Sequence, residues 1–522
     1  EISTVPAANI KRLAKEFATE ARIGSTIVID GVEVPYRPAA AIAFRGSQGH
    51  KNSTYNMLAI DLLNQLVGGA DMAGGCLGFN PACHGYPGTG RLRYTPHPDP
   101  DGMMITGSWL SPHLPYPFSA PQAPERIGMQ ELFPMSMASV FQTSTDNEEV
   151  WSKFDYDYRP EMILNVGANM LMSVGNKDTV AQAVEKYKFI VSLDIYLTES
   201  SDFADIVLPD ADYLESLDSR SNFPFVFSHP AGMGEWCWPI RQPITEPMGG
   251  RRTHAEVLSE LAERCGFLAD YNLAVNSHLD LEPPNRLELD RRYSYEEVCD
   301  ADLKDKFGPE KGLDWFKENG VMKWPKKPEE VYWRHFVDVR VPIYWEFMPG
   351  MWEEINAIAG PKGFDVPREH YSPLPDWLPC PSHECTKEGF DFYAFYYRDV
   401  IHTNSLTMEN AWLDEAAQMD PFSYNVALNA AKGRALGLKN DDMVWVENEY
   451  GVRVKGKLRL TEAIHPEGVG IGACAGHWNK SMPRALGKGV FFNDLIALDW
   501  EHSSPSNLNL DLCAKVRISK AE

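Results

Sequence analysis

The chain has 522 residues, of which 44% are hydrophobic and 23% are charged, so its composition is that of a folded protein with more than one hydrophobic core. Its 49 basic and 73 acidic residues give a formal net charge of −24, which argues against nucleic acid as a partner because phosphate binding needs a basic surface. We find neither a signal peptide at the start nor an apolar run of about 18 residues, and therefore expect a soluble chain of unknown compartment.

The first patterns alternate between helix and strand. A helix is expected over residues 6–20, because Pro6 suits a helix start and apolar residues recur at helical spacing over 10–17. A chain that opens in this way is either a fragment or one subunit of a split protein. Residues 39–49 predict a small-residue strand running into a glycine-rich turn, and residues 54–69 predict a helix that ends at two glycines. Strand, glycine turn and helix in this order indicate an α/β domain.

The next stretch, residues 74–148, is rich in Gly, Pro, His and Met and shows no period, so we expect long loops that serve a function or contact a partner. The nine cysteines of the chain are scattered and odd in number, which gives no disulfide framework. The closest sets are Cys76 with Cys83 and Cys380 with Cys385, and both lack the C-x-x-C spacing of zinc and iron–sulfur sites. Buried or loop thiols are therefore the default interpretation.

A strand, a helix and a second strand are then expected between residues 161 and 194. The first strand ends at a turn over 167–169, a helix covers 178–187, and a β-branched strand ends at Asp194. A further apolar strand over 206–208 stops at Pro209. An acidic side chain just past the carboxyl end of a parallel strand lies where open α/β sheets bind nucleotides, and its carboxylate can accept hydrogen bonds from ribose or guanine. The alternative is an ordinary strand with a polar loop.

The second half of the chain changes character. A helix is expected over 253–267, ending near Gly266, and residues 270–390 predict loops and short helices because they show no dominant period. The many aromatic residues of 315–397 indicate core packing or partner contacts, with a substrate funnel as the alternative. From about residue 388 onward, short alternating strands and a hairpin at 450–451 predict a β-barrel-like domain.

Three blocks of sequence now stand in order: residues 163–176 with the strand pair in 191–209, then RDVIHTNSLT at 398–407, then residues 425–478. In this order and spacing they resemble the molybdopterin oxidoreductases of the dimethyl sulfoxide reductase family. These are molybdenum or tungsten enzymes that hold two pyranopterin guanine dinucleotides. The third block resembles the dinucleotide-binding C-terminal domain of that family, and residues 5–75 resemble its mid-chain pattern. The likeness weakens in 76–150 and 270–385.

The resemblance implies an α/β fold: Rossmann-like α/β/α domains with parallel sheets, followed by a C-terminal β-barrel domain. We expect three domains. Residues 1–155 would form the end of a central α/β domain with long loops, and 156–387 a second α/β dinucleotide-binding domain with an irregular insert. Residues 388–522 would form the barrel that binds the molybdopterin dinucleotide.

The family also implies what this chain lacks. Its [4Fe-4S] cysteines and the protein ligand to its metal lie upstream of the helix that resembles residues 5–18, so no residue here is assigned a metal-ligand or catalytic role. The chain is then expected to be the C-terminal portion of a catalytic subunit, with the cluster in a missing N-terminal portion or in a partner. The N-terminal half of the catalytic unit is one implied partner if it is separate. An iron–sulfur electron-transfer subunit is another, and a membrane-anchor subunit is left open.

The resemblance assigns cofactor contacts residue by residue. Gly167, Ala168 and Asn169 would line one dinucleotide, since small residues permit close approach, with an ordinary turn as the alternative. Asp194 would bond its guanine or ribose, and Thr198 and Glu199 would contact the same nucleotide. The other expected contacts follow the second pterin or face the metal cavity, and they are His402, Thr403, Ser405, Asn425, His477, Asn493 and Gln48, with His50 beside the last. For His402 a purely structural role is the alternative.

The function implied is part of the catalytic subunit of a hetero-oligomeric oxidoreductase of anaerobic respiration. It would catalyse two-electron oxygen-atom or hydroxyl transfer and pass electrons to iron–sulfur partners. The pattern is closer to the branch that handles sulfur oxyanions, arsenate, or aromatic and hydrocarbon compounds than to assimilatory nitrate reductases. Two alternatives stay open: a non-redox hydratase or transhydroxylase on the same cofactor, and a cofactor-free structural subunit of a respiratory complex.

Overall fold

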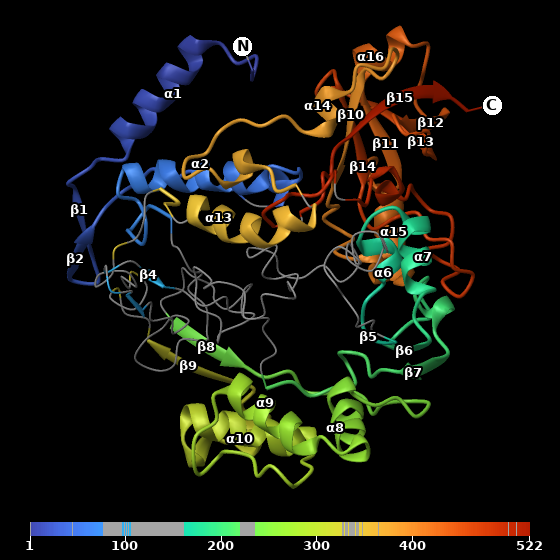
Figure 1. Cartoon of the computed structure of the whole chain (residues 1–522). Coiled ribbons are helices and arrows are strands. Elements are labelled where there is room, and N and C mark those ends of the chain that lie inside the picture. Colours follow the sequence, from blue (N-terminus) through green and yellow to red (C-terminus); the bar gives the residue numbers. More distant parts are fainter. Residues whose placement is uncertain are drawn as a thin grey trace. The chain divides into compact units, whose positions relative to one another are not determined.

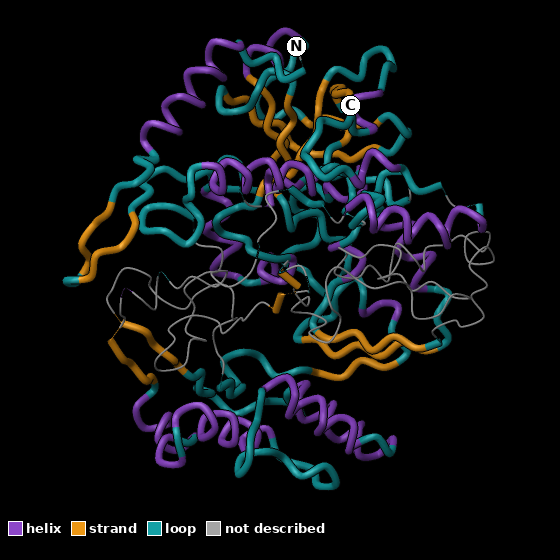
Figure 2. The backbone as a smooth tube through the Cα atoms, turned by 60° about the vertical axis from the view of Figure 1, so that its left-hand side comes forward, coloured by secondary structure: helices purple, strands orange, loops and turns teal. Residues whose placement is uncertain are grey.

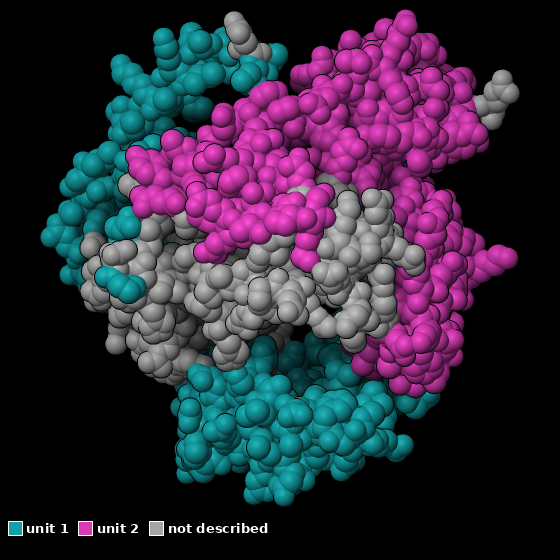
Figure 3. Space-filling view, in the orientation of Figure 1, with its two compact units in different colours: residues 1–42, 60–104, 209–341 teal, residues 43–59, 105–208, 342–522 magenta. Residues whose placement is uncertain are grey.

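The computed structural model describes residues 2–43, 45–76, 161–219, 235–325, 348–363, 365–499, 501–507 and 509–521, together with residues 97–98, 100, 102, 104–105, 328, 332, 340 and 344–346 (Figure 1). Contacts group the chain into two compact units (Figure 3). Unit 1 comprises Glu1–Ile42, Ile60–Met104 and Pro209–Val341, and unit 2 comprises Ala43–Ala59, Ile105–Leu208 and Pro342–Glu522. Within these described ranges, no helix is both long and apolar enough to cross a bilayer. The loops expected over 74–148 lie largely outside them, as does Cys83. The division into three domains stays a prediction.

Unit 1 begins with helix α1 (Ala7–Glu20), which confirms the helix expected over 6–20. A hairpin of β1 (Thr26–Ile29) and β2 (Val32–Pro35) follows, and Figure 2 shows the strands in orange. Helix α2 (Ser53–Leu66) confirms the helix expected over 54–69, and Gly68, at φ +67°, lies just past its end.

For residues 39–49 we predicted a strand that runs into a glycine-rich turn, and the strand part of this prediction is wrong. Residues 39–43 have no regular structure, and Arg45–Gln48 forms a 3-10 helix. The cause is the side-chain amide of Asn64 in α2, whose Oδ1 accepts from the main-chain N–H of Ala41 and whose Nδ2 donates to the Ala41 carbonyl, both at 2.8 Å. These are the two main-chain bonds that a neighbouring strand would make, so no strand partner is needed.

The second part of unit 1 is helical. Its elements are α8 (His254–Cys265), α9 (Leu268–Leu279), α10 (Tyr295–Phe307) and α11 (Leu313–Asn319), with the antiparallel strands β8 (Glu235–Pro239) and β9 (Val321–Pro325). The helix expected over 253–267 is confirmed, because Thr253 caps α8 and Gly266 ends it at φ +84°. Within the segment of 270–390, for which loops and short helices were expected, α9 and α10 are helices of 12 and 13 residues. Helix α10 begins with Ser294 and Glu297 capping each other, a Ser-x-x-Glu signal that the sequence contains.

Unit 2 contains a three-stranded sheet in the order β5-β6-β7. Strands β5 (Met162–Val166) and β6 (Phe189–Asp194) are parallel, and helix α7 (Lys177–Val184) connects them after the short α6 (Met170–Ser173). Strand β7 (Ile206–Pro209) completes the sheet. The strand–helix–strand unit expected from the sequence is confirmed.

Unit 2 also contains a closed barrel in the order β10-β14-β11-β13-β12-β15, which confirms the α/β fold with a C-terminal barrel. Its strands are β10 (Phe392–Tyr397), β11 (Asn425–Asn429), β12 (Met443–Asn448), β13 (Arg453–Thr461), β14 (Gly468–Gly472) and β15 (Ala514–Lys520). The hairpin at 450–451 is confirmed between β12 and β13, with Gly451 at φ +88°. Alternate barrel side chains such as Val426, Val444 and Val516 are fully buried and form one core with α7.

Four further helices belong to unit 2: α13 (Met348–Ala359), α14 (Pro381–Glu384), α15 (Ala411–Met419) and α16 (Ala430–Ala435). Trp352 in α13 donates its indole N–H to the Val366 carbonyl at 2.8 Å, and the guanidinium of Arg368 lies 5.1 Å from its ring centre. This aromatic side chain therefore packs within the unit, as expected for the 315–397 segment. The described cysteines are free thiols.

Candidate functional site

A cavity of about 460 Å³ lies in unit 2 beside the carboxyl end of β5. We call it the β5 cavity. Four segments line it: the turn and helix after β5, the end of β10 with its following loop, the loop after β14, and the segment of 491–512. The lining residues are Gly167, Ala168, Asn169, Met172, Ser173, Val174, Tyr396, Arg398, Asn404, Ser405, Leu406, Ala473, Cys474, Ala475, Phe491, Phe492, Asn493 and Leu512. Its volume is in the range of small-molecule sites, roughly 300–1,000 Å³.

Gly167 keeps one wall of the cavity open. Its φ is +60°, a conformation that glycine adopts without strain, and a Cβ built there meets no atom within 4 Å. Its main-chain N–H donates to the Leu193 carbonyl at 2.8 Å, which fixes the turn to the end of β6. The turn therefore presents bare backbone at the carboxyl edge of a parallel strand pair, where α/β sheets bind nucleotides.

Polar groups on the other walls can recognise a ligand. Arg398 follows β10 and is exposed, and within the described ranges its guanidinium forms no hydrogen bond or ion pair. Asn404 accepts from the N–H of Thr407 at 3.2 Å, which leaves its amide N–H groups as donors. Asn493 donates to the Met172 carbonyl at 2.7 Å, which leaves its oxygen as an acceptor. The cavity thus offers a planar cation together with amide donors and acceptors, a set that suits a phosphate and a heterocycle.

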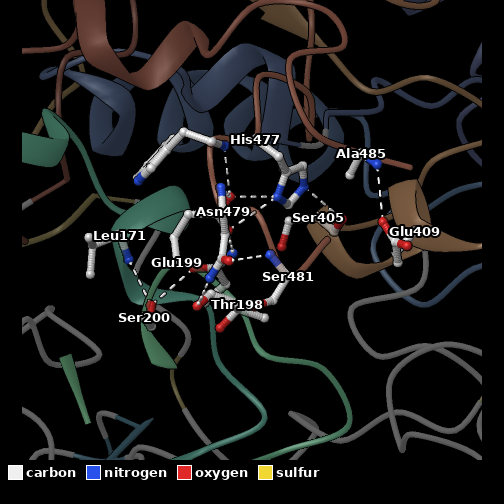
Figure 4. Close-up of polar contacts among 12 residues, drawn as sticks. Leu171, Thr198, Glu199, Ser200, Ser405, Glu409, His477, Asn479, Ser481 and Ala485 are labelled. Atoms are coloured by element: carbon white, nitrogen blue, oxygen red, sulfur yellow. Dashed lines mark hydrogen bonds and ion pairs between the residues drawn. The ribbon is translucent and has the colours of Figure 1, made fainter. Parts of the chain in front are cut away.

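A fully buried carboxylate, that of Glu199, joins the segments that line the cavity (Figure 4). It accepts from the His477 ring at 2.9 and 3.1 Å, from the main-chain N–H groups of Trp478 and Asn479 at 3.0 and 3.2 Å, and from the Asn169 amide at 2.8 Å. The loop after β6 is thereby bound to the loop after β14 and to the turn after β5.

The geometry also assigns a charge to the partner of this carboxylate. The His477 Nδ1 faces Glu199, and its Nε2 lies 2.9 Å from the Ser405 carbonyl oxygen, so both ring nitrogens meet acceptors. Only the imidazolium form donates at both nitrogens. Burial alone would raise the pKa of Glu199, but the hydrogen bond and charge of His477, with the Asn169 bond, lower it to about 2. The pair is therefore a buried ion pair that holds Ser405 and Asn169, two residues that line the cavity.

A second layer of hydrogen bonds supports this ion pair (Figure 4). The Ser200 hydroxyl donates to the Asn169 oxygen at 3.0 Å and accepts from the Leu171 N–H at 3.2 Å. The Asn479 amide donates to the Thr198 carbonyl at 2.6 Å, and the Thr198 hydroxyl lies 3.2 Å from that of Ser201. The side chains of Thr198 and Glu199 thus have internal partners.

His402 is also internal. Its ring is buried, with Nε2 2.9 Å from the Tyr424 hydroxyl, and burial lowers its pKa. Tyr424 in turn donates to Asp414 at 3.0 Å, and Asp414 accepts from the Lys488 ammonium at 2.6 Å. This chain of bonds anchors the start of the loop whose next residues, Asn404 and Ser405, line the cavity.

The structure therefore brings together the predicted residues 167–169, Ser405 and Asn493 at the cavity and places Glu199 and His477 directly behind it. Four other predicted residues are not among the lining residues: Asp194, Thr403, Asn425 and Gln48. Asp194 ends β6 and its Oδ1 accepts from the Ile195 N–H at 2.8 Å, and the Asn425 amide donates to the Pro421 carbonyl at 2.9 Å. Cofactor contacts for these four residues stay predictions.

His50, expected beside Gln48, has partners within unit 2. Its Nε2 lies 2.6 Å from the Asn56 amide nitrogen and its Nδ1 lies 3.5 Å from the Cys380 sulfur. Burial, and secondarily His383, lower the pKa of this imidazole. The Gln48 carbonyl accepts from the Asn509 amide at 2.8 Å.

Sequence reasoning missed several lining residues. Arg398 stands first in the block RDVIHTNSLT, so its motif was recognised although its side chain was not singled out. Tyr396, Phe491 and Phe492 read as ordinary strand or core residues. Cys474 adopts φ +73°, and no local signal marks that conformation in the sequence.

Two family models match segments of this chain. The family model described as molybdopterin oxidoreductase matches residues 42–264, and that described as molydopterin dinucleotide binding domain matches residues 392–507. The two matches contain most of the residues that line the β5 cavity.

Two curated relatives and one solved structure serve as examples of the proteins to which the chain is similar. It is 24% identical over 607 residues to a sulfite dehydrogenase subunit of Allochromatium vinosum, covering 100% of this chain and 60% of that protein. It is 26% identical over 317 residues to the thiosulfate reductase molybdopterin-containing subunit PhsA of Salmonella typhimurium, covering 59% of this chain and 37% of that protein. The fold is similar to that of acetylene hydratase from Pelobacter acetylenicus, with a TM-score of 0.59 and 16% identity over 99% of this chain and 63% of that one. The chain thus spans no more than 60% of the length of these two curated relatives.

Proposed function

Because the chain belongs to the molybdopterin oxidoreductase family, we propose that its β5 cavity holds the nucleotide part of a molybdopterin guanine dinucleotide in a molybdenum or tungsten oxidoreductase. The single observation that carries this proposal is the donor set of the cavity. An exposed guanidinium with no protein partner in the described part of the chain, two amides and a bare glycine turn meet at the carboxyl edge of β5 and β6. This set fits a group with a pyrophosphate and a purine.

Each group has a role in this proposal. Arg398 would hold the pyrophosphate, and Asn404 and Asn493 would hold the heterocycle. Gly167 and Ala168 let the ligand approach the backbone. Glu199 and His477 act as positioning residues, because their ion pair holds Asn169 and Ser405 in place.

When bound, the metal of such a cofactor would supply two-electron redox chemistry, and this chain would bind and orient the cofactor. The second dinucleotide, an iron–sulfur cluster and electron-transfer partners belong to the whole enzyme. They are proposed here from the family alone, as is oxygen-atom or hydroxyl transfer on the substrate. By their names, the two curated relatives act on sulfite and thiosulfate, and a sulfur oxyanion is the substrate class that we propose to assay first in the assembled enzyme.

The test is cofactor content. The full chain is produced in a host that makes the guanine dinucleotide cofactor, and its molybdenum, tungsten, oxidised pterin and released GMP are measured. Arg398→Glu should reduce pterin and GMP at least about tenfold, since a charge-assisted phosphate contact contributes about 1.5–3 kcal/mol. Arg484→Glu makes the same change of charge at an exposed residue that does not line the cavity, and it should retain the wild-type content. Equal loss or equal retention in both variants would contradict the proposal.

A further inference from the structure

A second cavity lies wholly in unit 1 and is lined in part by residues of α8, α9 and α10. We call it the helical cavity. Its volume is about 420 Å³, again within the range of small-molecule sites. Helices α9 and α10 lie outside both family matches, which end at residue 264 and resume at 392. The cofactor proposal therefore makes no use of this space.

The walls of the helical cavity are mostly apolar and aromatic. The residues that decide its character are Tyr271, Val275, Leu279, Tyr293, Tyr295 and Val298. Tyrosine rings provide flat surfaces against which another ring stacks or packs edge to face, with a gain of roughly 0.5–1.5 kcal/mol per pair. An apolar cavity of this size with three ring walls suits a small aromatic molecule.

Polar groups without protein partners point to a specific kind of aromatic molecule. Ser259 in α8 is only 7% exposed and lines the cavity, yet its hydroxyl has no hydrogen-bond partner in the described part of the chain. Tyr271 is half-buried and also lines the cavity, and its hydroxyl has no hydrogen-bond partner in the described ranges either. Asn272 donates its amide to three main-chain carbonyls, at 2.8, 2.9 and 3.3 Å, but no described group donates to its oxygen. These groups leave donors and acceptors for a ligand that carries a hydroxyl or amide.

Other groups that line the cavity have partners within the protein. The Tyr295 hydroxyl bonds Asp218 at 3.5 Å, and that carboxylate lies 3.9 Å from the Arg241 guanidinium. Burial raises the pKa of Cys299 to about 11, which keeps this thiol neutral. Burial likewise raises the pKa of Tyr295. The Asp218 carboxylate and the His278 imidazole also line the cavity.

We propose that the helical cavity binds a small aromatic molecule that carries one hydroxyl or amide group. The ring packs against the tyrosine walls, and the polar group bonds the hydroxyls of Ser259 and Tyr271. The site is independent of the dinucleotide site, because every residue that lines it belongs to unit 1.

The experiment is a calorimetric and ligand-detected NMR titration of the full chain with phenol, with benzene as the probe that lacks a hydroxyl. We expect saturable phenol binding, and benzene should bind about three- to tenfold more weakly because one hydrogen bond is lost. Ser259→Ala should weaken phenol binding by a similar factor and leave benzene binding unchanged. This conservative variant removes only a hydroxyl, so folding is expected to be retained.

A second variant tests the space itself. Ala274→Phe places a ring at the edge of the cavity and should reduce the affinity for both probes at least about tenfold, since a ring in the cavity excludes them. Ala14→Phe makes the same change on α1, at an exposed position, and should bind as the wild type does. The proposal is overturned by the absence of saturable phenol binding, by benzene binding as tightly as phenol, or by Ala274→Phe binding as the wild type does while it retains the wild-type circular dichroism spectrum.

Discussion

The change of Glu199 to Gln tests the buried ion pair behind the β5 cavity. The carboxylate accepts hydrogen bonds from the Asn169 amide, the His477 ring and two main-chain N–H groups. Gln keeps the shape but offers one acceptor oxygen, and it turns an NH₂ group toward these donors. It also removes the negative charge that balances the His477 imidazolium.

The structure gives the size of the effect in two ways. Removing one partner of a buried pair leaves an uncompensated charge, which costs about 3–5 kcal/mol. The pKa of Glu199 falls from an ordinary 4.5 to about 2, and this shift corresponds to about 3 kcal/mol at neutral pH. A folded-state pKa below the unfolded one gives stability that is complete above about pH 4.5 and is lost as the pH falls toward 2. We therefore expect Glu199→Gln to cost about 3 kcal/mol at pH 7 and progressively less below pH 4.5.

The assay is hydrogen exchange of the backbone, read by mass spectrometry on peptides that cover residues 196–203 and 474–480. A loss of about 3 kcal/mol in local stability speeds exchange about 100-fold, since each factor of ten corresponds to about 1.4 kcal/mol. Glu409→Gln is the matched control, because Glu409 accepts from the N–H groups of Arg484 and Ala485 at 3.0 Å and forms no ion pair within the described ranges (Figure 4). It should change exchange in these peptides less than about threefold. Exchange in Glu199→Gln within threefold of the wild type at pH 7 would refute the reasoning.

Two further predictions concern stability. A Cβ on Gly476, which has φ +89°, would overlap the main-chain nitrogen of Phe491, so Gly476→Ala should cost about 2–4 kcal/mol in a urea or thermal unfolding measurement. Gly487 also has a positive φ, +68°, but open space around it, and Gly487→Ala should cost only about 1–2 kcal/mol; equal costs would show that the close contact is irrelevant. Burial raises the pKa of Asp511 from 3.8 to about 6, so the charged form destabilises the fold progressively as the pH rises through this interval. Asp511→Asn should therefore raise the thermal midpoint at pH 7 and leave it nearly unchanged at pH 3.5, and a carboxyl titration by NMR that places this group near its ordinary value would contradict the argument.

Local signals in the sequence predicted those parts of the fold that depend on local chemistry. Periodicity followed by a glycine predicted three elements: the strand before Gly167, the helix before Gly266 and the hairpin at Gly451. Each of these glycines adopts a positive φ in the structure. The strand expected near Ala41 was wrong because the amide of Asn64, distant in sequence, takes its main-chain hydrogen bonds. Such a bond depends on tertiary structure and leaves no periodic trace.

The candidate site was predicted as a set of residues but not as an arrangement. The family resemblance named both Glu199 and His477, which are 278 positions apart, yet nothing in either segment shows that their side chains form a pair. The role of Arg398 likewise depends on the absence of a nearby carboxylate partner in the described structure, which the sequence alone does not show. Motif order predicted where the site is, and the hydrogen bonds divide its residues into those that line the cavity and those that position them.

The central claim is that the β5 cavity binds the nucleotide part of the cofactor. The most direct measurement is a calorimetric titration of the purified chain with GDP, which carries the guanine and the pyrophosphate of the dinucleotide. We predict saturable binding to one site, at least about tenfold weaker in Arg398→Glu and unchanged in Arg484→Glu. No saturable GDP binding, or equal affinity in the wild type and Arg398→Glu, would contradict the account.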